Sequence, residues 1–253
     1  MYSAAHHANE WITTPVLLKF AEEVGNALRA GSSIQDVPAS DLLDAATIYL
    51  VPMVNPDGVD LVTGAIPPGS REYELAQNLA SFYPEIPFPD GWKANLRGVD
   101  LNLQYPAGWE QARQIKFSQG YTRPGPRDYV GRAPLDQLES RALAEYTRYI
   151  DPALVLAYHT QGREIYWQYQ DLPVPGAREL AEEFGRLSGY TVADVPYESG
   201  FAGYKDWFIQ EFRRPGFTIE AGSGVNPLPI EQFEQIYKDN LGILTTAALG
   251  LPE

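Results

Sequence analysis

The 253-residue sequence contains no cysteine and only three histidines. The lack of cysteine excludes disulfide bonds and any metal site built on thiolates. Lysine and arginine number 19 against 33 acidic residues, and the formal net charge of −14 disfavours nucleic acid as a partner. No apolar run is long enough for membrane insertion, and no signal-peptide pattern is visible. We therefore expect a cytoplasmic location, or secretion if a targeting segment precedes this sequence.

The three histidines fall in two short segments. The first is His6-His7-Ala8-Asn9-Glu10, and the second is Tyr158-His159-Thr160. His7 and Glu10 are three residues apart and share one face where the chain turns into a helix. Two imidazoles and one carboxylate suit Zn²⁺. A structural site would fill the fourth position, typically with cysteine, so the pattern predicts a catalytic site with one zinc ion and a water.

Helical patterns alternate with short apolar segments over most of the chain. We expect strands at residues 46–54, 153–159, 164–168, 190–192 and 217–221, and helices at residues 14–30, 134–150, 176–188, 203–212 and 229–249. This order predicts a three-layer α/β/α fold with a central mixed, largely parallel sheet. Thr13 and Thr14 are expected to cap the first helix, and Gly31 to end it. His159 would then close a buried strand, at the sheet edge where open α/β folds place ligands.

Residues 55–132 are rich in proline, glycine and aromatic side chains and show little periodicity, which indicates either a long functional loop region or secondary structure that the sequence pattern does not reveal. No linker is visible, so we interpret residues 1–253 as a single catalytic domain. Only six residues precede His7, whereas a zinc site of this kind normally rests on a preceding strand. We therefore expect a domain truncated at its N-terminus and lacking its first strands. An apolar edge would then be exposed before His7 or at residues 46–54.

Five segments of the chain resemble, in order, the zinc carboxypeptidases, which are the M14 metallopeptidases. They are His7-Ala8-Asn9-Glu10, Asn55-Pro56-Asp57-Gly58, Gly98-Val99-Asp100-Leu101-Asn102, Tyr158-His159-Thr160-Gln161 and Phe217-Thr218-Ile219-Glu220. The stretches 100–109 and 125–129 also resemble a narrower subgroup, the bacterial γ-D-glutamyl-L-diamino acid peptidases. Those enzymes cut the stem peptides of cell-wall peptidoglycan.

The resemblance implies a role for each matching residue of the metal site. His7, Glu10 and His159 match the zinc ligands of the family. Glu220 matches the general base, which takes a proton from water and passes it to the leaving amine. Asp100 matches the carboxylate that hydrogen-bonds to the first zinc histidine and fixes its tautomer.

The resemblance also implies candidates for substrate contacts. Lys93 falls where the family has an arginine that stabilises the oxyanion, with Arg97 as the alternative. Asn102 matches half of the Asn-Arg pair with which carboxypeptidases bind a C-terminal carboxylate. Leu103 stands in place of that arginine and cannot pair with a carboxylate. Recognition of an ordinary free C-terminus is therefore disfavoured.

Two further positions bear on substrate recognition. Tyr197 is the best match to the mobile tyrosine of the family, and Tyr204 is the alternative. Asn9 stands between the ligands, where carboxypeptidases often carry an arginine. This second departure also weakens the ordinary recognition of anionic groups.

We therefore expect a zinc-dependent peptidase that hydrolyses a γ-D-glutamyl-diamino acid amide bond in peptidoglycan stem peptides through metal-activated water. The expected partner is a peptide or muropeptide, and the sequence specifies no oligomeric state and neither endo- nor exo-cleavage. The alternatives are a generic zinc metallocarboxypeptidase, a small-substrate zinc amidohydrolase and an inactive metal-free binding module. Leu103 disfavours the first alternative, and the roomy loop region disfavours the second. The presence of all ligands and the base disfavours the third.

Overall fold

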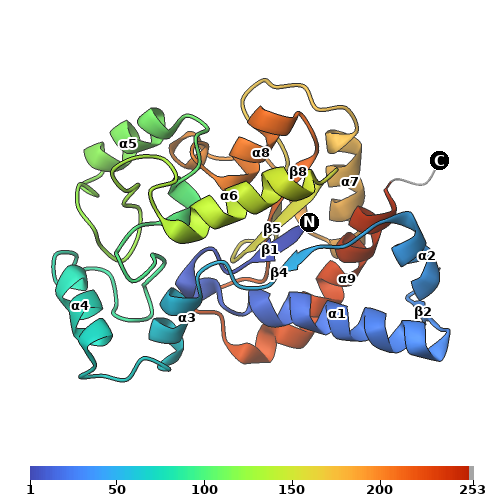
Figure 1. Cartoon of the computed structure of the whole chain (residues 1–253), viewed down its shortest axis with the longest axis horizontal. Coiled ribbons are helices and arrows are strands. Elements are labelled where there is room, and N and C mark those ends of the chain that lie inside the picture. The colour runs from blue at the N-terminus through green and yellow to red at the C-terminus, as the bar shows by residue number, and fades with distance from the viewer. Residues whose placement is uncertain (251–253) are drawn as a thin grey trace.

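A six-stranded sheet lies at the centre of the computed structural model, which describes residues 1–250 (Figure 1). The strand order is β4-β1-β5-β8-β6-β7. The strands are β1 (Tyr2–Ala4), β4 (Leu50–Val51), β5 (Val155–His159), β6 (Glu164–Tyr166), β7 (Thr191–Ala193) and β8 (Gly216–Glu220), and β2 (Ser33–Ile34) and β3 (Val37–Pro38) form a separate pair. β4, β1, β5 and β8 are parallel, whereas β6 pairs antiparallel with β8. The predicted mixed, largely parallel sheet is confirmed.

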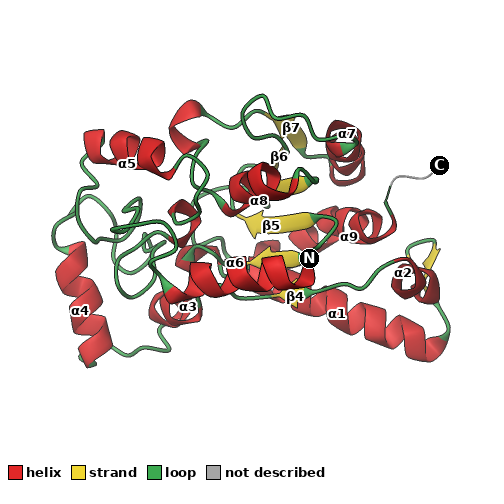
Figure 2. Cartoon of the chain, turned by 45° about the horizontal axis from the view of Figure 1, so that its top comes forward, coloured by secondary structure: helices red, strands yellow, loops and turns green. Residues whose placement is uncertain are grey.

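Helices cover both faces of the sheet and complete the three layers (Figures 1 and 2). The helices are α1 (Thr13–Ala30), α2 (Ala39–Ala45), α3 (Pro56–Thr63), α4 (Arg71–Ala80), α5 (Trp109–Ser118), α6 (Leu138–Ile150), α7 (Ala177–Ser188), α8 (Tyr204–Phe212) and α9 (Phe233–Leu249). Apolar residues of α1, α2, α7 and α9 pack on one face, and those of α6 and α8 pack on the other. No helix within residues 1–250 is both long and apolar enough to cross a membrane.

The apolar run of β5 explains why its strand is buried on both sides. Leu156 and Tyr158 join the core on the α1 and α9 face, whereas Val155 and Ala157 join the core on the α8 face. All four side chains are at most 1% exposed. Burial of a large apolar side chain contributes about 1.5–3 kcal/mol. The strand is therefore fixed in register, and its last residue, His159, is held in one place.

The start of the chain differs from the expectation. The residues before His7 form β1, which lies inside the sheet between β4 and β5 and is fully buried. The strand expected at residues 46–54 is reduced to Leu50–Val51 at the sheet edge, where both residues are half-buried. Pro52 has no N–H to continue the ladder, and α2 occupies the chain shortly before. Of the two segments expected to expose an apolar edge, only the one that contains β4 lies at an edge of the sheet.

Residues 55–132 are not one long loop, because α3, α4 and α5 lie within them and were not assigned from the sequence. The side chain of Asn55 caps α3 by accepting a hydrogen bond from Gly58 N at 3.2 Å, and Pro56 occupies the first turn. Ser70 caps α4 in the same way through Tyr73 N at 3.3 Å. In Figure 2 the arrows of β1 and β5 point toward the side where these helices lie. This region therefore faces the carboxyl ends of the parallel strands.

The ends of α1 were predicted with mixed success. Gly31 ends the helix at φ 61°, as expected for a C-cap glycine. The threonine caps were wrong, because Ile12 is the N-cap residue and no side chain caps the helix. Thr13 Oγ1 instead accepts a hydrogen bond from Ala5 N at 3.1 Å and donates to Glu10 O at 2.8 Å. The hydroxyl thus fixes the segment that carries the histidines. The helix predicted from residue 134 begins only at Leu138.

Candidate metal centre and active site

Three adjacent parallel strands deliver the candidate residues to one edge of the sheet. His7 follows β1 after a two-residue turn, His159 is the last residue of β5, and Glu220 is the last residue of β8. His159 and Glu220 are direct partners in the register of β5 and β8. A short 3-10 helix, η1 (Ala8–Glu10), then carries Glu10 back toward His7. The segments therefore meet at the carboxyl edge, as the sequence predicted.

His7, Glu10 and His159 form a compact cluster whose ligand atoms lie within 4.8 Å of one another. His7 Nδ1 is 2.9 Å from Glu10 Oε1, and His159 Nδ1 is 2.8 Å from Glu10 Oε2. The two Nδ1 atoms are 3.3 Å apart. Two imidazole nitrogens and one carboxylate thus converge on a single point, which is the donor set that Zn²⁺ prefers.

The protonation chemistry of the cluster also fits a cation. Asp100 Oδ1 lies 3.1 Å from His7 Nε2, which favours a proton on that outer nitrogen and leaves the Nδ1 lone pair directed at Glu10. Burial lowers the pKa of His7, but the carboxylates of Glu10 and Asp100 outweigh this and raise it to about 9. The same carboxylates that favour a proton here would favour a metal ion in its place.

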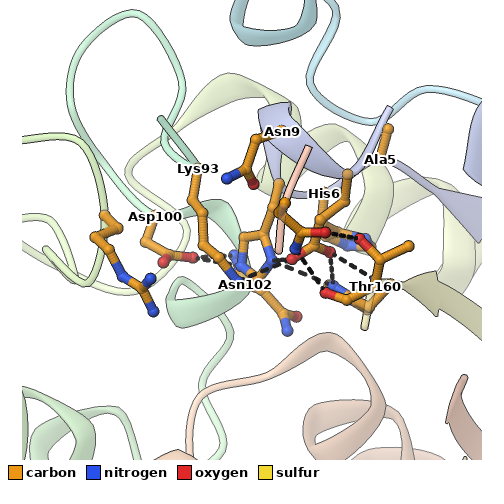
Figure 3. A network of polar contacts seen from close by, with 12 residues as sticks. Ala5, His6, Asn9, Lys93, Asp100, Asn102 and Thr160 are labelled. Atoms are coloured by element: carbon orange, nitrogen blue, oxygen red, sulfur yellow. Dashed lines mark hydrogen bonds and ion pairs between the residues drawn. The ribbon is translucent and has the colours of Figure 1, made fainter. Parts of the chain in front are cut away.

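Glu10 is a buried carboxylate that stays ionised. Its side chain is 1% exposed, and Lys93 Nζ lies 2.8 Å from Oε1. Figure 3 shows Lys93 reaching into the polar network that also contains Asp100 and Thr160. Thr160 N donates to Oε2 at 3.3 Å. Burial raises the pKa of Glu10, but His7, Lys93 and His159 together hold it well below its usual value. Burial lowers the pKa of Lys93, but the carboxylate of Glu10 outweighs this effect and raises the pKa above its usual value.

Asp100 is fixed from two sides beside the cluster. Its Oδ1 accepts a hydrogen bond from Asn102 N, and its Oδ2 accepts one from Asp128 N, each at 3.1 Å. Burial raises the pKa of Asp100, but His7 and Lys93 hold it well below the usual range. Asp100 is therefore an anion that can accept a hydrogen bond from His7.

A cavity of about 930 Å³ opens in front of the cluster, and Glu220 lines it together with the three candidate ligands. Within residues 1–250, Glu220 forms no hydrogen bond or ion pair with these ligands and is not part of their cluster. Burial and the neighbouring charge of Glu10 raise the pKa of Glu220 to about 8. A bound cation would lower it again. Glu220 is thus placed to exchange a proton in the cavity.

The structure separates the two candidates for an oxyanion donor. Lys93 lines the cavity and contacts Glu10, whereas the side chain of Arg97 is exposed and lies outside the cavity lining of the described chain. Asn102 and Leu103 also line the cavity. Leu103 packs against Trp109 and is 8% exposed, so the cavity wall is apolar at this point.

Neither tyrosine candidate is among the residues that line the large cavity in the described chain. Tyr204 is fully buried in α8, and its hydroxyl lies 2.9 Å from that of Thr147. Tyr197 is 65% exposed and lines a smaller cavity of about 260 Å³, which shares Val195 and Asp206 with the large one. Tyr197 thus lies on the surface, where its hydroxyl accepts a hydrogen bond from Gln111 Nε2 at 3.0 Å.

Sequence reasoning gave no role to several residues of the site. Lys116, Arg127 and Asp128 line the large cavity, and Arg127 belongs to the stretch 125–129 that resembles the narrower subgroup. His6 is fully buried and stacks on His159 with ring centroids 5.5 Å apart. The stretch 125–129 was therefore the signal for Arg127 and Asp128, but its resemblance alone did not say which side chain faces the cavity.

Comparisons with known proteins agree with this arrangement. A family model described as zinc carboxypeptidase, Peptidase_M14, matches residues 1–242, and the chain belongs to this family. The chain is 48% identical over 242 residues to γ-D-glutamyl-L-diamino acid endopeptidase 1 of Lysinibacillus sphaericus. That match covers 96% of this chain but 59% of the relative, so the chain spans about three fifths of its length.

Two solved structures show the same fold. Thrombin activatable fibrinolysis inhibitor matches with a TM-score of 0.71 and 19% identity, over 98% of this chain and 61% of that one. Murein-tripeptide amidase MpaA from Escherichia coli O157 matches with a TM-score of 0.56 and 18% identity, over 100% of this chain and 81% of that one. At these identities the likeness concerns the fold alone.

Proposed function

We propose that the chain is a single catalytic domain of a zinc-dependent peptidase that hydrolyses the amide bond between a γ-D-glutamyl residue and a diamino acid in peptidoglycan stem peptides. The observation that carries the reaction type is the convergence of His7, Glu10 and His159 on one point, with Glu220 in the same cavity. The substrate class is supported by the relative that is 48% identical.

His7 Nδ1, His159 Nδ1 and Glu10 would hold the zinc ion, with Asp100 orienting His7. When bound there, zinc polarises a carbonyl and makes water acidic enough to attack near neutral pH. In this proposal Glu220 accepts the proton of the attacking water and delivers it to the leaving amine. Its place at the end of β8, beside the ligands but outside their cluster, supports that role.

Lys93 is the proposed donor to the oxygen that becomes negative in the reaction. Its ammonium group lies 2.8 Å from Glu10 Oε1 and its side chain is 17% exposed, so it is charged and screened from water. A fixed donor is most effective where water is excluded. Arg97 lacks this placement, because its side chain is on the surface.

The cavity wall also supports an enzyme that does not require an ordinary C-terminal carboxylate beside the cut bond. Leu103 offers neither charge nor hydrogen bond, and Asn9 Nδ2 donates to Asp90 O at 2.9 Å. Asn102 Oδ1 accepts from Tyr204 N at 3.0 Å, so its NH₂ group is the part available to a substrate. In this proposal Asn102 contacts the substrate backbone, and Tyr197 closes over the substrate from the surface.

The proposal is tested with two peptides that differ in the linkage and the configuration of the glutamyl residue. L-Ala-γ-D-Glu-L-Lys and L-Ala-α-L-Glu-L-Lys are incubated with the zinc-loaded protein, and kcat/KM is measured for release of lysine. We expect the γ-linked peptide to react at least about 100-fold faster, because a site built for one set of polar contacts rejects a substrate that leaves them unpaired. Chelated protein serves as the background control. Equal or faster cleavage of the α-linked peptide would contradict the proposed substrate and favour a generic carboxypeptidase.

A further inference from the structure

The large cavity contains positive charge that the metal site does not use. The basic side chains that line it are Lys93, Lys116, Arg127 and Lys205. A γ-D-glutamyl substrate has a carboxylate that needs a positive partner, and Leu103 cannot supply one. The partners that each basic group already has decide which of them can take this role.

Three of these groups are engaged in contacts within the protein. Lys93 Nζ lies 2.8 Å from Glu10 Oε1, and Lys116 Nζ lies 2.7 Å from Asp128 Oδ1. Lys205 Nζ donates to a backbone carbonyl at 2.6 Å and also contacts the adjacent carboxylate. Their side chains are 17%, 10% and 4% exposed, respectively. Lys93 is already assigned to the oxygen that becomes negative, and Lys116 and Lys205 present no accessible, unpaired charge to a substrate carboxylate.

Arg127 is different. Its Nε lies 2.5 Å from Asp128 Oδ2, and within residues 1–250 this is the only ion pair of its guanidinium. Its side chain is 40% exposed and lines the cavity. The two terminal nitrogens, Nη1 and Nη2, therefore remain for a ligand. Such a pair of parallel N–H donors matches the two oxygens of a carboxylate.

The segment around Arg127 is fixed against the catalytic residues. Pro126 O accepts a hydrogen bond from the backbone N–H of Lys93 at 2.7 Å. Asp128 N donates to Asp100 Oδ2 at 3.1 Å, and Asp100 Oδ1 is 3.1 Å from His7 Nε2. Asp128 itself has φ 65°, a conformation that non-glycine residues rarely adopt and that surrounding contacts must hold. Arg127 is thus held in place by a segment that contacts Asp100, which in turn contacts the candidate metal ligand His7.

We propose that Arg127 binds the free α-carboxylate of the γ-glutamyl residue and thereby selects an acyl-side residue that carries a free carboxylate. This inference rests on the proposed function. In a γ-linked residue the α-carboxylate remains free on the acyl side, separated from the scissile carbonyl by the α carbon and two methylene groups. An α-linked glutamyl residue instead has its free carboxylate at the γ position, the same number of carbons from its scissile carbonyl, with its amino nitrogen on the carbon next to that carbonyl. An arginine fixed beside the metal site, and turned toward the cavity, therefore selects for a free carboxylate on the acyl side of the scissile bond.

Two γ-linked peptides test this inference without changing the scissile bond. L-Ala-γ-D-Glu-L-Lys carries the free α-carboxylate, and its α-carboxamide analogue L-Ala-γ-D-isoglutaminyl-L-Lys does not. We expect the wild-type protein to prefer the acid over the amide by about 10- to 100-fold in kcat/KM, which is the scale of a charged hydrogen-bonded contact. In Arg127→Met this preference should fall to about one, mainly because kcat/KM for the acid substrate falls. Arg127→Lys should retain part of the preference.

A surface arginine close to Arg127 in the sequence provides the matched control. Arg132 is 87% exposed and contacts Asp136, outside the cavity lining of the described chain. Arg132→Met should keep the wild-type preference. Zinc content and the melting temperature identify a variant that has lost its fold, and the wild-type preference is measured independently of any variant.

The possible outcomes separate this inference from the proposed function. A wild-type protein that cleaves acid and amide equally well would overturn the role of Arg127 and leave the peptidase proposal standing. Equal losses on both substrates in Arg127→Met would also overturn it, because they would indicate a role in the chemical step or in folding. A wild-type protein that cleaves neither γ-linked peptide would overturn the proposed function, and the role of Arg127 with it.

Discussion

Glu220→Gln should lower kcat on a γ-D-glutamyl-diamino acid peptide by about two orders of magnitude or more, which is the usual scale for loss of a general base. The substitution keeps the shape of the side chain and removes its ability to take a proton. Zinc should remain bound at the wild-type level, because Glu220 lies outside the cluster of ligand atoms. The measurements are steady-state kinetics and the metal content of the same preparation.

Glu164 offers a matched control for this substitution. It is the direct register partner of Glu220 on the neighbouring strand β6, and it accepts a hydrogen bond from Tyr166 OH at 2.6 Å. Glu164→Gln should therefore change kcat by only a few fold, since Glu164 does not line the cavity of the described chain. Near-normal turnover in Glu220→Gln would show that another residue activates the water.

His159→Ala should lose stoichiometric zinc and measurable activity together. The substitution removes one of two imidazole nitrogens, which lie 3.3 Å apart and share the carboxylate of Glu10. Two remaining donors form an incomplete site, because catalytic zinc is held by three protein ligands. Metal analysis after dialysis, together with the γ-linked peptide assay, measures both effects.

His6, the third histidine of the chain, provides the control variant for His159→Ala. His6 stacks on His159, and its Nε2 lies 3.2 Å from Tyr105 OH, but it is not a member of the ligand cluster. His6→Gln should therefore retain zinc at or near one ion per chain. Full zinc occupancy in His159→Ala, or loss of zinc only in His6→Gln, would show that the ligands have been assigned incorrectly.

The candidate metal site could be predicted from the sequence because each of its two segments has a pattern that is readable locally. The spacing of His7 and Glu10 is set within one turn, and His159 ends an apolar run that is readable as a buried strand. The fold class followed from the alternation of such runs with helices. The strand β1 was missed because three residues are too few to show a period, and only its pairing with β4 and β5 defines it.

The substrate side of the cavity could not be predicted in the same way, because its geometry depends on contacts between distant segments. Lys93 N bonds to Pro126 O, and Asp128 N bonds to Asp100, across stretches of 33 and 28 residues. These contacts, and not the local sequence, turn Arg127 toward the cavity. Similarly, the sequence favoured Tyr197 over Tyr204 as the mobile tyrosine, but it did not show that Tyr204, in the helix expected at residues 203–212, is buried against Trp207.

The zinc dependence of γ-D-glutamyl hydrolysis is the most direct test of the account. The protein is stripped with a chelator, dialysed and titrated with Zn²⁺ while cleavage of L-Ala-γ-D-Glu-L-Lys is followed. We predict no turnover in the metal-free protein, and a linear rise that saturates at one equivalent of zinc per chain, because one cluster of three ligands supplies the site. Full activity in the metal-free protein, or no cleavage of the γ-linked bond after one equivalent of zinc is bound, would contradict the account.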